Sequence, residues 1–209
     1  MSNEQIDLKL KQFDEFFSIT HHFNINAKPL VNGHNISYND FVNDMPTPFK
    51  LANDIDTLDQ AALAPLGAIS GIAGQLVQYL NHQAKKVDLL VNHILSEQDE
   101  KDHRYQGTNF GGGGIEFISD NSLCLNDVIE LKIFLTHANC AIYCHSEVIS
   151  IEEKLLEGDT ANNDKQYRHK VIFRHIREDD RERLVRSSLH LQSKQLQQLA
   201  KERNKQSNQ

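Results

Sequence analysis

Four consecutive glycines, Gly111–Gly114, lie between two short runs with strand character and constrain the fold of this chain strongly. Glycine admits positive φ and lets another segment approach the backbone closely. A phosphate-binding loop needs a helix directly after its glycines, so that helical N–H groups face the phosphate. Residues 115–119 instead show the alternation of a strand, and no Lys-Ser or Lys-Thr follows. We therefore expect a glycine-rich turn between strands rather than a kinase or Rossmann loop, and a turn without a ligand is its simplest interpretation.

The residues around and after this turn predict a small antiparallel β-barrel. Runs at 105–110, 115–119, 128–136, 141–152 and 166–175 have strand character, and polar turns separate most of them. Apolar side chains recur at alternate positions, so one face of each strand is expected to be buried. The residues expected inside the barrel are Ile129, Leu131, Ile133, Leu135, Val148, Val171 and Phe173.

Two long helices are expected to flank the barrel. Residues 66–97 carry a stripe at steps of four and three, which is the heptad pattern of a coiled coil. The expected self-association interface is Leu76, Leu80, Gln83, Val87, Leu90 and Ile94. Gln83 is the polar exception, and a polar residue in such a seam fixes register and oligomer state at some cost in stability. A single amphipathic helix lying on the barrel is the alternative.

These patterns predict an α+β chain in four parts. Residues 1–57 form an arm, with a short amphipathic helix to about residue 18 and then an irregular stretch whose simplest role is packing or a dimer contact. Residues 58–98 hold the heptad-patterned helix, and residues 99–177 the barrel. Residues 178–209 hold a C-terminal helix, which repeats the four-and-three spacing, and a polar tail.

Composition limits the classes of function. The net charge of −7 argues against a general nucleic-acid binder. Three cysteines without disulfide spacing favour a reduced, cytoplasmic setting, and the first residues lack the features of a secretory signal. Residues 60–84 carry no charge, but Pro65, Gln75, Gln78 and Asn81 are unfavourable in lipid. We expect a buried helix interface there rather than a membrane span.

The stretch from His137 to His145 contains the ligand types of a zinc site, because Cys140 and Cys144 lie within it. In a strand, however, Cys140 and Cys144 share one face and His145 points to the other. We therefore expect buried cysteines and no metal. The sequence also has no His-Glu-x-x-His motif, nucleophile elbow or spaced acid–base pair, so we expect no catalytic residues and no enzyme.

The ordered set of strands and motifs resembles the PilZ domain family, bacterial receptors for cyclic di-GMP. The family carries an Asp/Asn-x-Ser-x-x-Gly motif on its barrel, and Asn109-Phe-Gly-Gly-Gly-Gly114 fits it with Gly111 in place of the serine. The strands around Glu147 and 171–173 follow in the family's order, so the resemblance covers roughly residues 100–203. It implies the candidate ligand-binding residues Arg104, Asn109, Gly111 and Gly114.

The arginines depart from the family pattern. Members that bind the nucleotide carry Arg-x-x-x-Arg well before this motif, and its guanidiniums clamp phosphates with paired hydrogen bonds. In this sequence Arg104 is the single arginine before Asn109. Arg177 and Arg181 have the spacing but follow the barrel, and we interpret them as a solvated pair at a helix start. Some PilZ-like proteins have long flanking helices, form oligomers such as tetramers and have a degenerate nucleotide site, and this chain looks most like those.

The function expected from the resemblance is cyclic di-GMP signalling, as a receptor or as an adaptor with a degenerate site. Cyclic di-GMP would be a weak regulatory ligand, and no cofactor is expected. The expected partners are further copies of the chain, through the helices, and other signalling or motility proteins, with no nucleic acid. A structural oligomerisation scaffold with no nucleotide role is the alternative, and an enzyme that uses the glycine turn is a third and weaker one.

Overall fold

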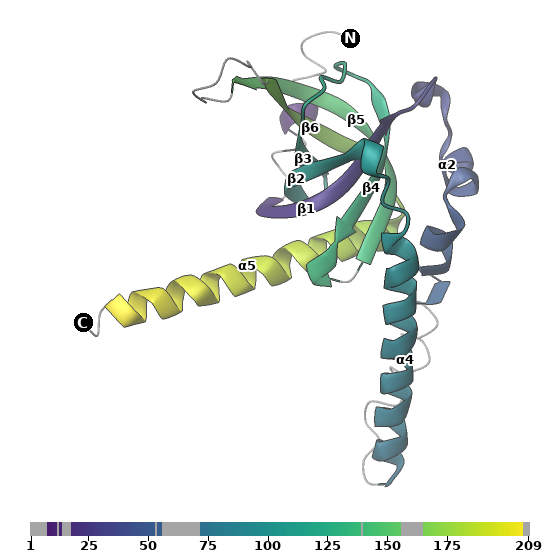
Figure 1. The fold of residues 1–209 in the computed structure, drawn as a ribbon, viewed down its shortest axis with the longest axis vertical. Helices are drawn as coiled ribbons and strands as arrows, with labels where there is room; N and C mark the ends of the chain where they lie inside the picture. The colour runs from purple at the N-terminus through teal and green to yellow at the C-terminus, as the bar shows by residue number, and fades with distance from the viewer. Residues whose placement is uncertain are drawn as a thin grey trace.

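The computed structural model describes residues 8–11, 13, 18–52, 54–55, 72–138, 140–155 and 165–206 of the 209-residue chain. Six antiparallel strands in this part of the chain close into a barrel, in the spatial order β1-β2-β3-β6-β5-β4 (Figure 1). They are β1 (Ser18–Pro29), β2 (Arg104–Gly111), β3 (Gly114–Ser119), β4 (Val128–Leu135), β5 (Cys140–Leu155) and β6 (Lys165–His175). Closure gives every strand two neighbours and leaves no sheet edge open. The predicted α+β class with an antiparallel barrel is confirmed.

The barrel encloses the main hydrophobic core. All seven residues that the alternation placed inside are buried, and six of them belong to β4 or β6. Phe110 and Ile115, on either side of the glycine turn, complete the core from β2 and β3. Full burial of one such side chain contributes about 1.5–3 kcal/mol, so the barrel interior is the main source of stability.

The first strand corrects the predicted domain limits. β1 lies between β2 and β4, whereas the sequence pattern placed residues 19–57 in an irregular arm and began the barrel at residue 99. The alternation of β1 is hard to recognise because the register shifts between Thr20 and Phe23, and because the polar Asn26 is buried. The barrel is therefore built from two segments that the arm and the long helix separate in sequence.

After β1, the described residues 30–52 form a short helix and a further helical stretch. Helix α2 (Tyr38–Asp44) begins with a capping box, in which the Ser37 hydroxyl accepts from the Asp40 N–H and the Asp40 carboxylate accepts from the Ser37 N–H. Helical residues 47–52 follow. Phe41 of α2 stacks on Tyr143 of β5, and both join a second hydrophobic cluster. Short 3₁₀ turns lie at η1 (Gly33–Asn35), η3 (Lys101–His103) and η4 (Thr136–Ala138).

Two long helices leave the barrel in different directions, as Figure 1 shows. Helix α4 (Ile72–Ser96) ends beside the barrel, where Leu95 is buried in the second cluster. Helix α5 (Glu178–Gln206) starts directly after β6, with acidic residues in its first turn. The predicted start of the first helix near residue 66 lies outside the described residues. Among the residues described, no helix is long and apolar enough to span a membrane.

Candidate functional site

The glycine turn joins β2 to β3, as the sequence predicted. Gly111 ends β2 and Gly114 begins β3, so no helix follows the glycines. Gly111, Gly112 and Gly114 are buried, and other elements hold the turn: the Phe173 N–H donates to the Gly113 carbonyl at 3.0 Å. Most of the turn backbone is therefore buried between other elements.

Gly114 is required by a close approach of the neighbouring strand. A Cβ atom at this position would lie 2.0 Å from the Val171 carbonyl oxygen of β6 and 2.9 Å from Cε2 of Phe13. The first distance involves backbone and leaves no room for relaxation. Gly114 is thus a packing residue of the barrel, whatever it contributes to a ligand.

Arg181 is part of this turn, which corrects its interpretation as a solvated residue. Its Nη1 donates to the Gly112 carbonyl at 2.6 Å, and this contact fastens the first turn of α5 to the glycine turn. Arg177 donates from Nε to the Asp180 carboxylate at 2.6 Å and from Nη2 to the Phe49 carbonyl at 3.0 Å. The Asp180 side chain is fully buried, and burial raises its pKa although Arg177 opposes the shift. The pair is therefore structural: one arginine holds the turn and the other holds the arm.

The N-terminal segment, described at residues 8–11 and 13, lies against the same region. Phe13 is buried beside Gly114, and the Lys170 Nζ stands 5.9 Å from the centroid of its ring. Lys9 pairs with Glu147 of β5, with 2.5 Å between Nζ and Oε1. This segment carries no arginine: Phe13 lies against the turn, and Lys9 lies against β5.

Arg104 lies away from the other candidate ligand residues. It begins β2, five residues before Asn109, and an extended strand carries those five residues over roughly 16 Å. Its guanidinium donates to Asp99, with 2.8 Å between Nη2 and Oδ2. The structure therefore brings Asn109, Gly111 and Gly114 together at one end of β2 and places Arg104 at the other.

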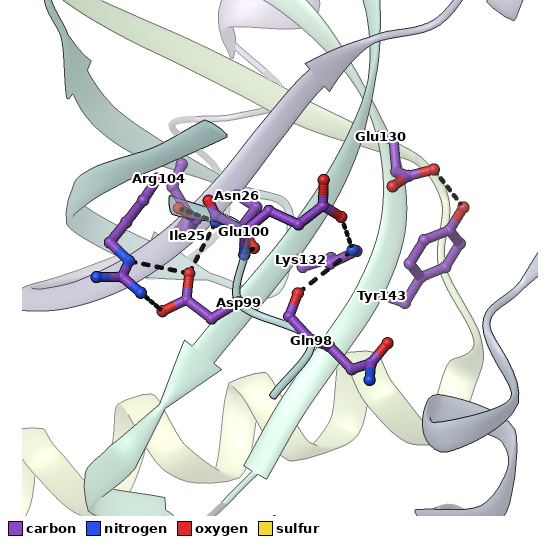
Figure 2. A network of polar contacts seen from close by, with 9 residues as sticks. All are labelled: Ile25, Asn26, Gln98, Asp99, Glu100, Arg104, Glu130, Lys132 and Tyr143. Carbon is purple, nitrogen blue, oxygen red and sulfur yellow. Dashed lines mark hydrogen bonds and ion pairs between the residues drawn. The ribbon is translucent and has the colours of Figure 1, made fainter. Parts of the chain in front are cut away.

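The Arg104 end of β2 belongs to a polar junction between the barrel and the end of α4, shown in Figure 2. Asn26 of β1 donates from Nδ2 to Asp99 at 2.9 Å and accepts at Oδ1 from the Glu100 N–H at 2.8 Å. Lys132 of β4 pairs with the Glu100 carboxylate, and this hydrogen bond lowers the pKa of Glu100. The junction fixes the chain just after α4 to the outside of the barrel.

A pair of neighbouring histidines, buried His145 and half-buried His175, lies where α2 covers the barrel. The rings of His145 and His175 are 5.9 Å apart, and Phe41 contacts both. Burial, and secondarily the neighbouring His175, lower the pKa of His145 to about 4, while Asp44 opposes the shift. Burial raises the pKa of the Cys144 thiol to about 12, inside the barrel. Among the described residues, no group of three or more His, Cys, Asp and Glu side chains could hold a metal.

The predicted interface residues lie on the outer surface of α4. Leu76, Leu80, Val87, Leu90 and Ile94 are each between 39% and 65% exposed. Gln83 is half-buried. Helix α5 likewise exposes Val185, Leu189, Leu196 and Leu199. These apolar stripes face outward in the single chain and are available for contact with another molecule.

Comparison with known proteins found no matching family model and no matching curated protein. Among solved structures, a tetrameric PilZ domain from Xanthomonas campestris, described as self-assembled through an unusual helical bundle, is 14% identical (TM-score 0.49) and covers 91% of this chain and 98% of that one. The PilZ domain of YcgR with c-di-GMP from Escherichia coli is 14% identical (TM-score 0.39; 49% of this chain, 84% of that one). MrkH of K. pneumonia is 15% identical (TM-score 0.41; 47% and 44%), so the match spans less than half of its length. Each of these likenesses concerns the fold alone.

Proposed function

We propose that this chain is a PilZ-like cyclic di-GMP signalling protein, a receptor or an adaptor, that assembles through its helices and has a degenerate nucleotide site. One observation carries the proposal. The segment Asn109–Gly114, which fits the family motif in sequence, forms the β2–β3 turn of a closed antiparallel barrel, and a long helix follows the last strand. The motif thus has the structural context that the resemblance implies.

Nucleotide binding by the isolated protein is expected to be weak. Gly111 offers no hydroxyl, and Arg104 is ion-paired at the far end of β2. Each missing charge-assisted hydrogen bond reduces binding by about 1.5–3 kcal/mol, which is one to two powers of ten in affinity. The net charge of −7 adds long-range repulsion toward a ligand with two phosphates. Cyclic di-GMP is therefore proposed as a weak regulatory ligand.

Self-association is proposed through α4, by the six-residue interface defined above, with the stripe of α5 as a second contact. Burial of apolar surface contributes roughly 25 cal/mol per Å². A stripe that extends over more than three heptads therefore favours association, provided that a second copy supplies the matching face. The downstream partners would be other signalling or motility proteins in the cytoplasm, and we assign the chain no catalytic role.

The test is calorimetry with cyclic di-GMP alongside light scattering on the same sample. We expect an oligomer and a dissociation constant above the micromolar range. Residual binding should fall with Asn109→Ala. A submicromolar affinity at physiological salt would contradict the degenerate site and identify a direct receptor.

The second candidate is a structural oligomerisation scaffold with no nucleotide role. The covered glycine turn favours it, because three of the four glycines are buried and Arg181 occupies the Gly112 carbonyl. The two candidates differ in calorimetry at high nucleotide concentration, where a receptor with a weak site still shows saturable heat and a scaffold shows none.

A further inference from the structure

The segment of residues 8–13 rests on a continuous outer face of the barrel. Glu116 of β3 is paired in register with Lys170 of β6, and Ile172 of β6 is paired with Glu147 of β5. Phe13 reaches this face at its β3 end and Lys9 at its β5 end. The short segment therefore crosses three strands and ends against the glycine turn.

Phe13 is the apolar contact that holds the segment. Its side chain is only 5% exposed, although it belongs to a short piece of chain outside the barrel. The ring lies over Gly114, where any side chain would collide with it, and under the Lys170 ammonium. A molecule that approaches the backbone of Gly114 from outside meets this ring first.

Lys9 is the charged contact. The side chain of Glu147 is 5% exposed, with Lys9 at 2.5 Å and Arg174 at 3.8 Å. A carboxylate this deeply buried is stable only with cations beside it. The attraction of the Glu147 carboxylate therefore holds the Lys9 side chain in place. Lys11, on the same segment, is exposed and offers a matched comparison.

We propose that residues 8–13 are a built-in cover of the glycine-turn face, which competes with a cyclic dinucleotide for that face and is displaced when one binds. The inference rests on the nucleotide role proposed above. Displacement would uncover Gly114 and the cations Lys170 and Arg174, whose present partners are Glu116 and Glu147. The weak binding would then have two causes: the missing arginines and the competition from the cover.

The cover has a quantitative consequence. If the face is open in a fraction f of molecules, the apparent dissociation constant is the intrinsic one divided by f. A cover that is closed in about nine molecules of ten weakens binding about tenfold. Because linkage is reciprocal, saturating nucleotide should release the segment to the same degree.

The experiment compares the full-length protein with Phe13→Asp and Lys9→Glu, which remove the two contacts. Lys11→Glu is the control, because it makes the same change in charge on the same segment without touching the barrel. Calorimetry with cyclic di-GMP gives the affinity, and the rate of tryptic cleavage after Lys11 in the wild type, Phe13→Asp and Lys9→Glu proteins reports release of the segment. The thermal unfolding midpoint of each variant checks that the barrel stays folded.

We expect Phe13→Asp to be cleaved about tenfold faster and to bind the nucleotide about tenfold more tightly. The gain in affinity should be smaller for Lys9→Glu and absent for Lys11→Glu. Faster cleavage with unchanged, measurable affinity would overturn the cover and leave the proposed function intact. Unchanged cleavage in both variants would show that these contacts do not hold the segment, and would also overturn it. If no variant binds nucleotide although the segment is released, both the cover and the nucleotide role fail.

Discussion

The barrel and the long helices bury their apolar residues in different ways. Inside the barrel, Ile129, Leu131 and Ile133 are fully buried, because six strands of one chain enclose them. On α4, Leu76 and Leu90 are 60% and 65% exposed in the same chain. The apolar residues of the barrel are thus buried within one molecule, whereas the described apolar residues of the heptad stripe stay exposed in a single chain. We therefore expect folding to depend on the barrel, and the proposed assembly to depend on the helices.

The largest effect should follow a change inside the barrel. Leu131→Ala removes a fully buried side chain and leaves a cavity, and such changes destabilise proteins by about 2–5 kcal/mol. Urea unfolding should show this loss in the free energy of unfolding, and the loss should not depend on protein concentration. Leu125→Ala in an exposed loop position is the control and should change stability little. Equal losses for both variants would contradict a core centred on the barrel.

The second effect concerns the stripe. Leu80→Asp combined with Leu90→Asp places two carboxylates in the proposed interface, so we expect monomers or insoluble protein with the barrel spectrum intact in the soluble fraction. Light scattering measures the mass, and circular dichroism checks the fold. Leu89→Asp, one position beside the stripe and 66% exposed, should leave the assembly unchanged. Dissociation by Leu89→Asp alone would place the interface on another face of α4.

The third effect concerns the junction that connects the two regions. Asn26→Ala removes three hydrogen bonds to residues 99–100 and leaves the partner groups without them, which should reduce stability by about 1–3 kcal/mol. Because β1 remains paired with β2 and β4, we expect the barrel to fold, while hydrogen exchange at residues 96–103 rises. Exchange that stays unchanged there would show that the junction does not hold the end of α4.

The smallest effect concerns the pH dependence of stability where α2 packs on the barrel. The folded-state pKa of His145 is lowered to about 4 from an ordinary 6.5, so the unfolded chain binds the proton more readily. The contribution of neutral His145 is complete above pH 6.5 and is lost as the pH falls toward 4. His145→Gln, which cannot titrate, should flatten the stability profile in this window. Burial also lowers the pKa of His175, so both histidines contribute to the profile and the comparison of the two profiles is the readout.

Local patterns predicted the features that depend on neighbours in sequence. Alternation from Ile129 to Leu135 placed β4 correctly. The heptad spacing also predicted α4, whose described part ends at Ser96, one residue from the predicted end. β1 was missed because a register shift and the buried Asn26 hide its alternation. Tertiary contacts of distant residues carried no local signal, as for Arg181 on the Gly112 carbonyl and Phe13 on Gly114. Arg104 was grouped with Asn109 by closeness in sequence, yet an extended strand holds them apart.

Light scattering of the unmodified protein over a range from low to high micromolar concentration measures whether the helices complete their packing between copies. The proposal predicts the mass of an oligomer, two or more times the 23.9 kDa of one chain, which stays constant over most of this range. A monomer at high micromolar concentration, with a folded barrel and both apolar stripes still exposed, would contradict it.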